Sequence, residues 1–367
     1  MLIRSDDKIT SSQAAIFLTD SVLGAGILTL PRDVTEKVQT PDSWLSVLLG
    51  GILVMIAILI MVKLSQQFPE NTVFEYSKKI VGTIPGSALS LLLILFFVMI
   101  AGFEIRVFAE VTLFFLLEGT PIWAIIIPFI WASVYLAAGG INSIARLFQI
   151  IFPICILILL LSLFLSVRLF DIHHLRPFLG EGFPPVLKGL KSSILVFSGC
   201  EVTLVLVAHL QHPEQAVKTM MAGLGIPLIL YFLTTIIVIG SVAIGSLQRS
   251  TWPTIDLLRS FEISGLFFER FEFPFLVIWM MQLFCNFTSF FFSASLGISQ
   301  VFHLKYKTVL LALMPVIFIA TLIPHTMNEI FKLGSIIGMM SVFLFLVVTC
   351  PLSLIFLLRK KGLKRHG

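Results

Sequence analysis

Long apolar stretches with almost no charged residues follow one another along the whole chain. From Leu147 to Val167, for example, the sequence contains no Lys, Arg, Asp, Glu or His. A stretch of about 20 apolar residues is long enough to cross the hydrocarbon core of a membrane as one helix. A helix makes every backbone hydrogen bond within its own segment, so lipid leaves no backbone group unpaired. The stretches therefore predict an all-α integral membrane protein.

The composition excludes a water-soluble chain. The 367 residues are 57% hydrophobic and only 12% charged, with 25 Lys and Arg against 20 Asp and Glu. In soluble domains charged residues make up about a quarter of the composition, roughly twice the share found here. Too little charge is left to cover a water-facing surface. The composition excludes a soluble enzyme, a disordered chain and a nucleic-acid-binding module.

The apolar stretches predict ten membrane-spanning helices. They lie near residues 10–31, 44–64, 86–117, 121–139, 143–170, 185–208, 219–246, 273–300, 306–324 and 330–358. Two connections are more than simple turns. Residues 68–82 predict either a short interfacial helix or a solvated connector, because their apolar residues can form one stripe. Residues 247–272 leave the same two alternatives open, with one or two helices on the outer surface.

The charge at the C-terminus predicts the orientation. Five basic residues crowd into the tail of residues 359–367, namely Arg359, Lys360, Lys361, Lys364 and Arg365. Cytoplasmic segments next to membrane spans carry an excess of Lys and Arg. Because ten spans return the chain to the side where it started, both termini are predicted to be cytoplasmic. The connection 247–272 is then external.

Two spans contain glycine-rich interruptions. The first carries Gly24-Ala25-Gly26, and the sixth carries Ser198-Gly199-Cys200 followed by the carboxylate of Glu201. A break in a membrane helix is tolerated where it is packed in protein or lines a cavity. A carboxylate within an apolar span is costly unless it pairs or meets water. These two breaks predict a ligand site.

The spacing of the breaks predicts two related halves. Gly24 and Gly199 are 175 residues apart, close to half of the ten-span region. Residues 1–183 and 184–358 each hold five spans, with the break in the first span of each half. Five is an odd number, so the second half enters the membrane from the opposite side. This is the pattern of inverted repeats whose interrupted helices meet near the midplane.

The sequence resembles the spore germination permeases, the B subunits of germinant receptors. The resemblance rests on Gln13, on GAGILTLP from Gly24 to Pro31, on FPENTVFEYSKKIVG from Phe68 to Gly82, and on FSGCE from Phe197 to Glu201. This family is a branch of the amino acid–polyamine–organocation superfamily. The resemblance implies a LeuT-like five-plus-five fold with discontinuous first and sixth helices.

The resemblance also implies a function and partners. Members of the family bind a small germinant, usually an amino acid, in the inner membrane of the dormant spore. They are expected to act with a membrane-spanning A subunit and a lipoprotein C subunit. The first alternative is a free-standing amino-acid transporter of the same superfamily. A more distant alternative is a channel with Glu104 and Glu201 lining its pore.

The predicted binding site combines the two breaks with the third and eighth spans, which the resemblance adds. Freed backbone N–H groups after the first break suit a ligand carboxylate, and carbonyls before the breaks suit an ammonium group. The side-chain pocket is expected to be apolar and aromatic. The candidate residues are Gly24, Ala25, Gly26, Met99, Gly102, Phe103, Phe197, Ser198, Gly199, Cys200, Thr288 and Ser289.

Charged residues in the third span have separate expected roles. Arg106 and Glu110 are four residues apart, so they lie on one helix face and predict a structural ion pair. Glu104 has no partner within its own helix and points elsewhere. Together with Glu201 it is a candidate polar gate or ion path.

Ion coupling stays open from the sequence. Thr288, Ser289 and Ser293 could hold sodium, whereas the fifth span lacks the lysine of some proton-coupled relatives. No arrangement of residues indicates catalysis, a metal site or a cofactor.

Overall fold

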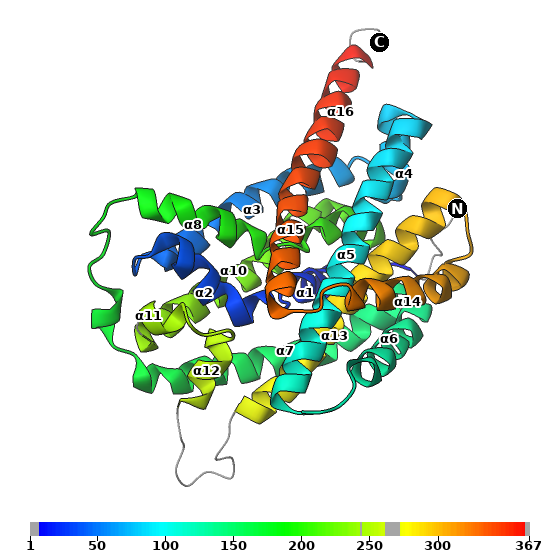
Figure 1. The fold of residues 1–367 in the computed structure, drawn as a ribbon. Helices are drawn as coiled ribbons and strands as arrows, with labels where there is room; N and C mark the ends of the chain where they lie inside the picture. The colour runs from blue at the N-terminus through cyan, green and yellow to red at the C-terminus, as the bar shows by residue number, and fades with distance from the viewer. Residues whose placement is uncertain (1–6, 243, 261–271, 364–367) are drawn as a thin grey trace.

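Helices make up nearly the whole structure, a computed structural model that describes residues 7–242, 244–260 and 272–363 (Figure 1). Within these ranges no strand is present apart from an isolated bridge between Ile9 and Leu210. The helices are α1 Ser11–Val22, α2 Gly26–Val38, α3 Ser43–Ser65, α4 Val73–Val81, α5 Thr83–Phe115, α6 Ile122–Ala138, α7 Gly140–Ser166, α8 Pro184–Leu195, α9 Thr203–Leu206, α10 Ala216–Ser241, α11 Ile244–Leu247, α12 Pro253–Arg259, α13 Glu272–Phe302, α14 Tyr306–Leu322, α15 Met327–Leu344 and α16 Cys350–Leu363.

Six helical segments of the described chain are long and apolar enough to cross a membrane, and two bent pairs bring the number to eight if each is one span. The six are Ser43–Ser65, Thr83–Phe115, Gly140–Leu169, Pro213–Ser241, Glu272–Phe302 and Met327–Arg359. Helices α6 and α14 are also apolar, but each has only 17 residues. The all-α membrane class is therefore confirmed, and the count of ten remains a prediction.

The first bent pair is α1 with α2, which meet at an angle of 53°. A capping box fixes the start of α1: Gln13 N donates to Thr10 Oγ1 over 3.3 Å, and Thr10 N donates to Gln13 Oε1 over 3.0 Å. Helix α1 ends at Val22, and α2 begins at Gly26. The bend lies at the glycine-rich segment that the sequence predicts as a break.

The second bent pair is α8 with the short helical turns of Cys200–His209, at an angle of 51°. Gly199 lies at the bend with φ of +110°, a backbone conformation that residues with a side chain rarely adopt. A Cβ atom there would also lie 2.2 Å from the carbonyl oxygen of Ser21. The glycine therefore allows the second bend to pack directly on the end of α1.

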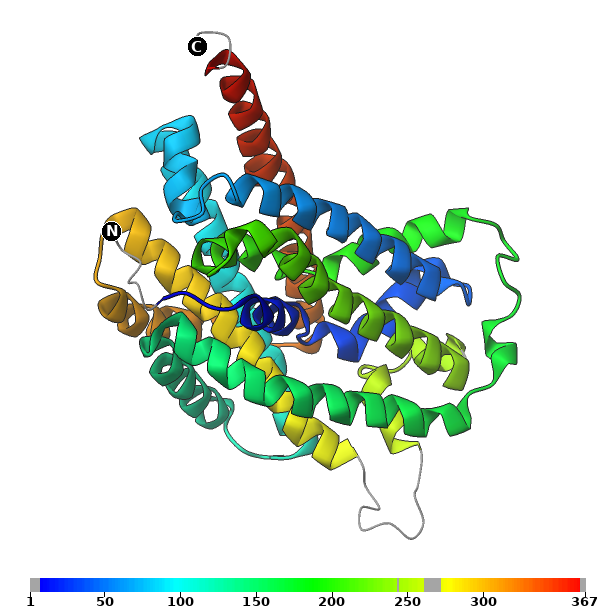
Figure 2. The ribbon, with the colours of Figure 1, turned by 180° about the vertical axis from the view of Figure 1, so that it is seen from behind.

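Helix α1 lies inside the assembly and is covered by other helices. It packs against α7, α10 and α13, and Figure 2 shows it nearly end-on in dark blue near the centre. The two longest helices, α5 and α13, pack along each other, with Phe97 and Phe290 stacked at 6.3 Å between ring centroids. This arrangement places both bends between long, mostly buried helices.

The outer helix faces are apolar. Exposed large apolar side chains occur on α3, α6, α7, α14 and α16, including Trp131, Leu157, Ile319 and Leu357. A water-soluble protein does not expose apolar surface on so many neighbouring helices. Lipid is the solvent that suits these faces, and the protein is a multi-pass membrane protein.

The two polar connections contain helices. Residues 68–82 contain α4, Val73–Val81. A capping box formed by Thr72 and Glu75 starts this helix, and the Tyr76 hydroxyl lies 3.2 Å from Ser65 Oγ of α3. The helical alternative is thus correct for this segment. The connection after α10 contains α11 and α12, while residues 261–271 lie outside the described part of the chain. Residues 364–367 of the predicted basic tail also lie outside it.

Candidate functional site

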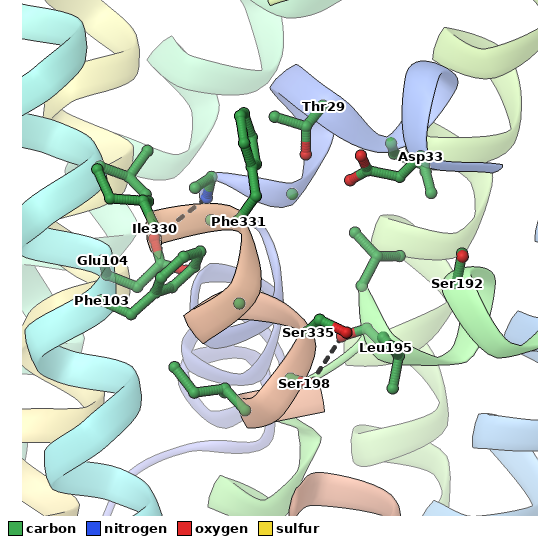
Figure 3. Close-up of a pocket in the computed structure, with 18 of the residues that line it drawn as sticks. Thr29, Asp33, Phe103, Glu104, Ser192, Leu195, Ser198, Ile330, Phe331 and Ser335 are labelled. Carbon is green, nitrogen blue, oxygen red and sulfur yellow. Dashed lines mark hydrogen bonds between the residues drawn. The ribbon is translucent and has the colours of Figure 1, made fainter. Parts of the chain in front are cut away.

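A cavity of about 390 Å³ lies beside the bend between α1 and α2. Its walls come from the end of α1, from α2, α5, α8 and α15, and from Trp252 just before α12. Figure 3 shows Thr29 and Asp33 of α2 across from Phe331 of α15 and Leu195 of α8. Six residues of the predicted site line this cavity: Gly24, Ala25, Gly26, Phe103, Glu104 and Ser198. The first break and part of α5 therefore line one cavity, and its role as a binding site stays a prediction.

The cavity extends from the bend along α2. Asp33, Glu36 and Lys37 line its far end together with Lys332 of α15. These residues follow the first predicted span, which the predicted topology places toward the outside. The walls near the bend are mainly apolar, with Ile100, Phe103, Leu195, Ile330 and Ile337. One end of the cavity is thus charged, and the other is apolar around a single carboxylate.

That carboxylate is Glu104 of α5, whose side chain is buried. Its Oε2 accepts a hydrogen bond from Ala25 N over 3.1 Å, next to the first turn of α2 (Figure 3). A negative charge is stabilised at a helix N-terminus, where backbone N–H groups point outward. A Cβ atom on Gly24 would lie 2.7 Å from Glu104 Oε1. Glycine at this position is what lets the carboxylate approach the break.

The carbonyl groups at the end of α1 also have internal partners. Gln282 Nε2 donates to Leu23 O over 2.9 Å, and Asn286 Nδ2 donates to Ser21 O over 2.9 Å. The Tyr231 hydroxyl donates to Val22 O over 2.7 Å. The sequence predicts that the carbonyl and N–H groups at this bend are free for a ligand, and here the structure differs. Side chains of α10 and α13 bond to the carbonyl groups, and Glu104 of α5 bonds to Ala25 N.

The second bend is held by its own carboxylate. Gly199 N donates to Glu201 Oε2 over 2.9 Å, and the Ser341 hydroxyl of α15 bonds to Glu201 Oε1. Ser198 Oγ donates to Leu195 O over 2.6 Å and borders the cavity. Glu201 does not line the cavity, so in this arrangement it ties the second bend to α15.

The other predicted site residues lie outside the cavity wall, and each has a packing contact. Phe197 is fully buried against Tyr231 at 5.2 Å between ring centroids. Thr288 Oγ1 donates to Phe284 O over 2.7 Å, and Ser289 Oγ donates to Cys285 O over 2.9 Å. The residues of the prediction that do not line the cavity are Met99, Gly102, Phe197, Gly199, Cys200, Glu201, Thr288 and Ser289.

Arg106 and Glu110 are in contact. Arg106 Nη2 lies 2.6 Å from Glu110 Oε1, and the side chains are 7% and 25% exposed. Neither residue lines the cavity. The pair joins successive turns of α5 on a largely buried face.

Three polar residues at the first bend are absent from the predicted site: Asp20, Gln282 and Asn286. Asp20 lies four residues before Gly24 in an otherwise apolar span, which is itself a signal that sequence analysis can use. Gln282 and Asn286 are four residues apart, so they share one face of α13. Only the fold shows that this face meets α1.

The fold is that of a class of membrane permeases. MhsT in complex with L-phenylalanine has a TM-score of 0.65 to this structure at 13% identity, covering 95% of this chain and 98% of that one. The nucleobase–cation symporter Mhp1 with bromovinylhydantoin bound gives a TM-score of 0.65 at 15% identity, covering 92% and 76%. Identities this low show the fold alone. The fold is LeuT-like, as the sequence predicts.

The chain belongs to the family of spore germination proteins, whose family pattern matches residues 8–330. Spore germination protein YndE of Bacillus subtilis (strain 168) is 46% identical over 357 residues, covering 97% of this chain and 98% of that protein. Spore germination protein A2 of the same organism is 37% identical over 354 residues, covering 96% of each. The resemblance noted from the sequence is confirmed.

Proposed function

We propose that the protein is the membrane subunit of a spore germinant receptor, and that it binds a small germinant, an amino acid, in the cavity beside the first bend. The observation that carries this proposal is the Glu104 carboxylate at the inner end of the cavity, beside apolar walls. Small-molecule sites have volumes of roughly 300–1,000 Å³ and combine apolar walls with a few placed polar groups. The cavity of about 390 Å³ fits that description.

Glu104 supplies the partner for the ammonium group of the amino acid. Its carboxylate already accepts from Ala25 N, so that N–H group is not available to the ligand carboxylate. A ligand carboxylate needs hydrogen-bond donors, and Ser192, Ser198 and Ser335, which line the cavity, each carry a hydroxyl group that can donate. The apolar walls accept the side chain. This binding mode reverses the polarity expected from the sequence.

The proposal includes the organisation of the chain in the membrane. We infer ten spans: the six long segments, the two bent pairs, and the shorter helices α6 and α14. Residues 1–183 and 184–358 then form two inverted halves of five spans, with the bent pairs as first and sixth helices. Both termini face the cytoplasm, and the membrane is the inner membrane of the dormant spore. An A subunit and a lipoprotein C subunit complete the receptor.

A binding measurement tests the site. The full chain is purified into lipid nanodiscs, and binding of labelled amino acids is measured for wild type, Glu104→Gln and Gly24→Ala. Glutamine keeps an oxygen for Ala25 N but removes the charge, and a hydrogen bond to a charged group contributes about 1.5–3 kcal/mol. We expect Glu104→Gln to weaken binding by roughly 10-fold to 100-fold.

Two variants serve as controls. Glu118→Gln removes an exposed carboxylate, and Gly225→Ala adds a methyl group that meets only Met55 Cε, at 3.5 Å. Both are expected to bind like wild type. Unchanged affinity in Glu104→Gln at normal protein levels would reject the ammonium partner assigned to Glu104.

The second candidate is a free-standing amino-acid transporter. The observation that favours it is the fold shared with MhsT over nearly the whole chain. Uptake of labelled amino acid into liposomes that contain only this protein separates the two. A receptor subunit binds the ligand without net uptake, whereas a transporter accumulates it.

A further inference from the structure

Asp20 lies in the membrane interior with no partner for its charge. Its side chain is completely buried in α1, and neither carboxyl oxygen has a hydrogen bond within the described chain. The amide of Gln282 on α13 lies next to it. A buried carboxylate without a counter-charge is among the most costly groups in a membrane protein. The residue therefore calls for a specific explanation.

The neighbouring amides direct their N–H groups at backbone carbonyls, and Gln282 interacts with the Asp20 carboxyl only outside strict hydrogen-bond geometry. The Gln282 amide donates to Leu23 O over 2.9 Å and to Asp20 O over 3.4 Å. The Asn286 amide donates to Ser21 O over 2.9 Å and to Asp20 O over 3.2 Å. A side-chain amide has two N–H groups, so both residues have used all their donors on backbone carbonyls.

The result is a surplus of acceptors. Four buried side-chain oxygens lack any hydrogen bond: both carboxyl oxygens of Asp20, Oε1 of Gln282 and Oδ1 of Asn286. Acceptors alone cannot satisfy one another. A cation shared among them is the one addition that satisfies the cluster. All four oxygens are shielded from solvent.

We propose that Asp20, Gln282 and Asn286 form a proton-binding site between α1 and α13, in which the Asp20 carboxyl holds a proton while the two helices are packed together. Protonation removes the charge and turns one acceptor into a donor for the amide oxygens. A proton needs no cavity of its own, whereas a hydrated or coordinated metal ion does. This site is distinct from the germinant cavity, because none of the three residues lines that cavity.

The groups that face Asp20 from the helices around α1 add no positive charge. Cys155 of α7 and Cys285 of α13 are close enough to interact with its carboxyl electrostatically. The Tyr231 hydroxyl of α10 donates to Val22 O, two residues further along α1. None of these groups carries a positive charge. They favour a neutral Asp20 over a charged one.

Infrared spectroscopy of the full chain in nanodiscs tests the proposal directly. A protonated carboxylic acid has a C=O stretching band well separated from the bands of a carboxylate. The wild-type minus Asp20→Asn difference spectrum at neutral pH should contain the protonated band. Glu118→Gln, which removes an exposed carboxylate, should give only carboxylate bands. A carboxylate signal for Asp20 would overturn the proposal.

Thermal unfolding gives a second readout. Asparagine resembles a protonated aspartate and brings two N–H donors to the acceptor-rich cluster, so Asp20→Asn should unfold at or above the wild-type temperature. Asp20→Leu leaves the amide oxygens unpaired and should unfold at a lower temperature. If Asp20→Asn fails to assemble, aspartate carrying a ¹³C-labelled carboxyl group in the wild-type chain still reports the protonated band through its isotope shift.

Sodium is the competing occupant. Unfolding of the wild-type chain should be the same in sodium chloride and in choline chloride. Stabilisation by sodium that disappears in Asp20→Asn would overturn the proton assignment in favour of a sodium ion.

Discussion

Two glutamates perform related tasks at the two bends. Glu104 accepts from Ala25 N across helices, and Glu201 accepts from Gly199 N within its own segment. In both cases a carboxylate pairs with a backbone N–H group that the bend leaves without a helical partner. The two differ in access, since only Glu104 lines the cavity. This difference separates a cavity-facing carboxylate from one that only ties the second bend to α15.

A substitution at Gly199 should reduce the amount of assembled protein more than it reduces ligand binding. From the sequence alone, Gly26→Ala and Gly199→Val are expected to assemble at near-normal levels and to lose the ligand response. The structure argues otherwise for Gly199→Val, because φ is +110° and a Cβ would lie 2.2 Å from Ser21 O. The backbone conformation alone costs about 1–3 kcal/mol for a residue with a side chain. We expect the level of this variant in membranes to fall strongly.

A matched substitution controls for the extra methyl groups. A Cβ on Gly245 has nothing within 4 Å, so Gly245→Val should accumulate like wild type on the same immunoblot. Equal levels of the two variants would contradict the close contact between the second bend and α1.

The Arg106–Glu110 pair is expected to stabilise α5. Removing one charge of a buried pair leaves the other uncompensated, at a cost of about 3 kcal/mol. Arg106→Ala should therefore lower the protein level and the unfolding temperature. The double variant Arg106→Met with Glu110→Leu should recover most of the loss, because it removes both charges and keeps apolar volume. A normal level of the single variant would show that the pair contributes little.

At the scale of helices, the two bends could be located from the sequence. Glycine-rich segments at corresponding positions of two halves predict them, and the structure bends at both segments. For residues 68–82 the sequence leaves helix and loop open, because an apolar stripe over so short a segment suits either structure. The helix there depends on its capping box and on tertiary packing of Phe74 and Tyr76.

The partners of the first bend could not be found from the sequence. Asn286 and Gln282 reach carbonyl groups that lie 265 and 259 positions earlier in the chain. Local patterns carry no information about such contacts. Similarly, Gly240 and Gly338 look like neutral positions away from the breaks, yet a Cβ there would lie 2.2 Å from Phe170 and 2.6 Å from Leu195. Contacts between segments far apart in the sequence explain why neither the partners of the first bend nor the crowding at these two glycines could be predicted.

Helix α15 should depend on its bond to the second bend. The Ser341 hydroxyl bonds to Glu201, and Ser341→Ala leaves one carboxylate oxygen buried without that partner. Such a loss costs about 1–3 kcal/mol. We expect a lower unfolding temperature for Ser341→Ala than for Ser143→Ala, whose hydroxyl bonds only to Gly139 O in its own helix region. Equal unfolding temperatures would mean that α15 does not depend on this bond.

At the scale of the whole molecule, the cavity has a direction. It extends from the first bend along α2 to Asp33, Glu36 and Lys37. In the topology predicted from the charge of the C-terminal tail, that end of α2 faces the outside. A germinant would then enter from the side opposite to the termini.

Cysteine labelling tests this orientation. In a chain without Cys155, Cys200, Cys285 and Cys350, a cysteine at the exposed position Asp256 of α12 should react with an impermeant reagent added outside. A cysteine at Lys307, an exposed residue in the first turn of α14, should react only after the membrane is opened. Labelling of position 256 only from inside would reverse the topology.

The isolated bridge near the N-terminus links the two bent pairs at a place away from the cavity. Ile9 N donates to His209 O over 2.8 Å, and Gln211 N donates to Ile9 O over 3.0 Å. These bonds join the residue before α1 to the end of the second bent pair. Separating the two segments requires breaking both bonds, so the bridge stabilises their packing without contacting the cavity. In the proposed role in a dormant spore, this link would hold the two bent pairs together while no germinant is bound.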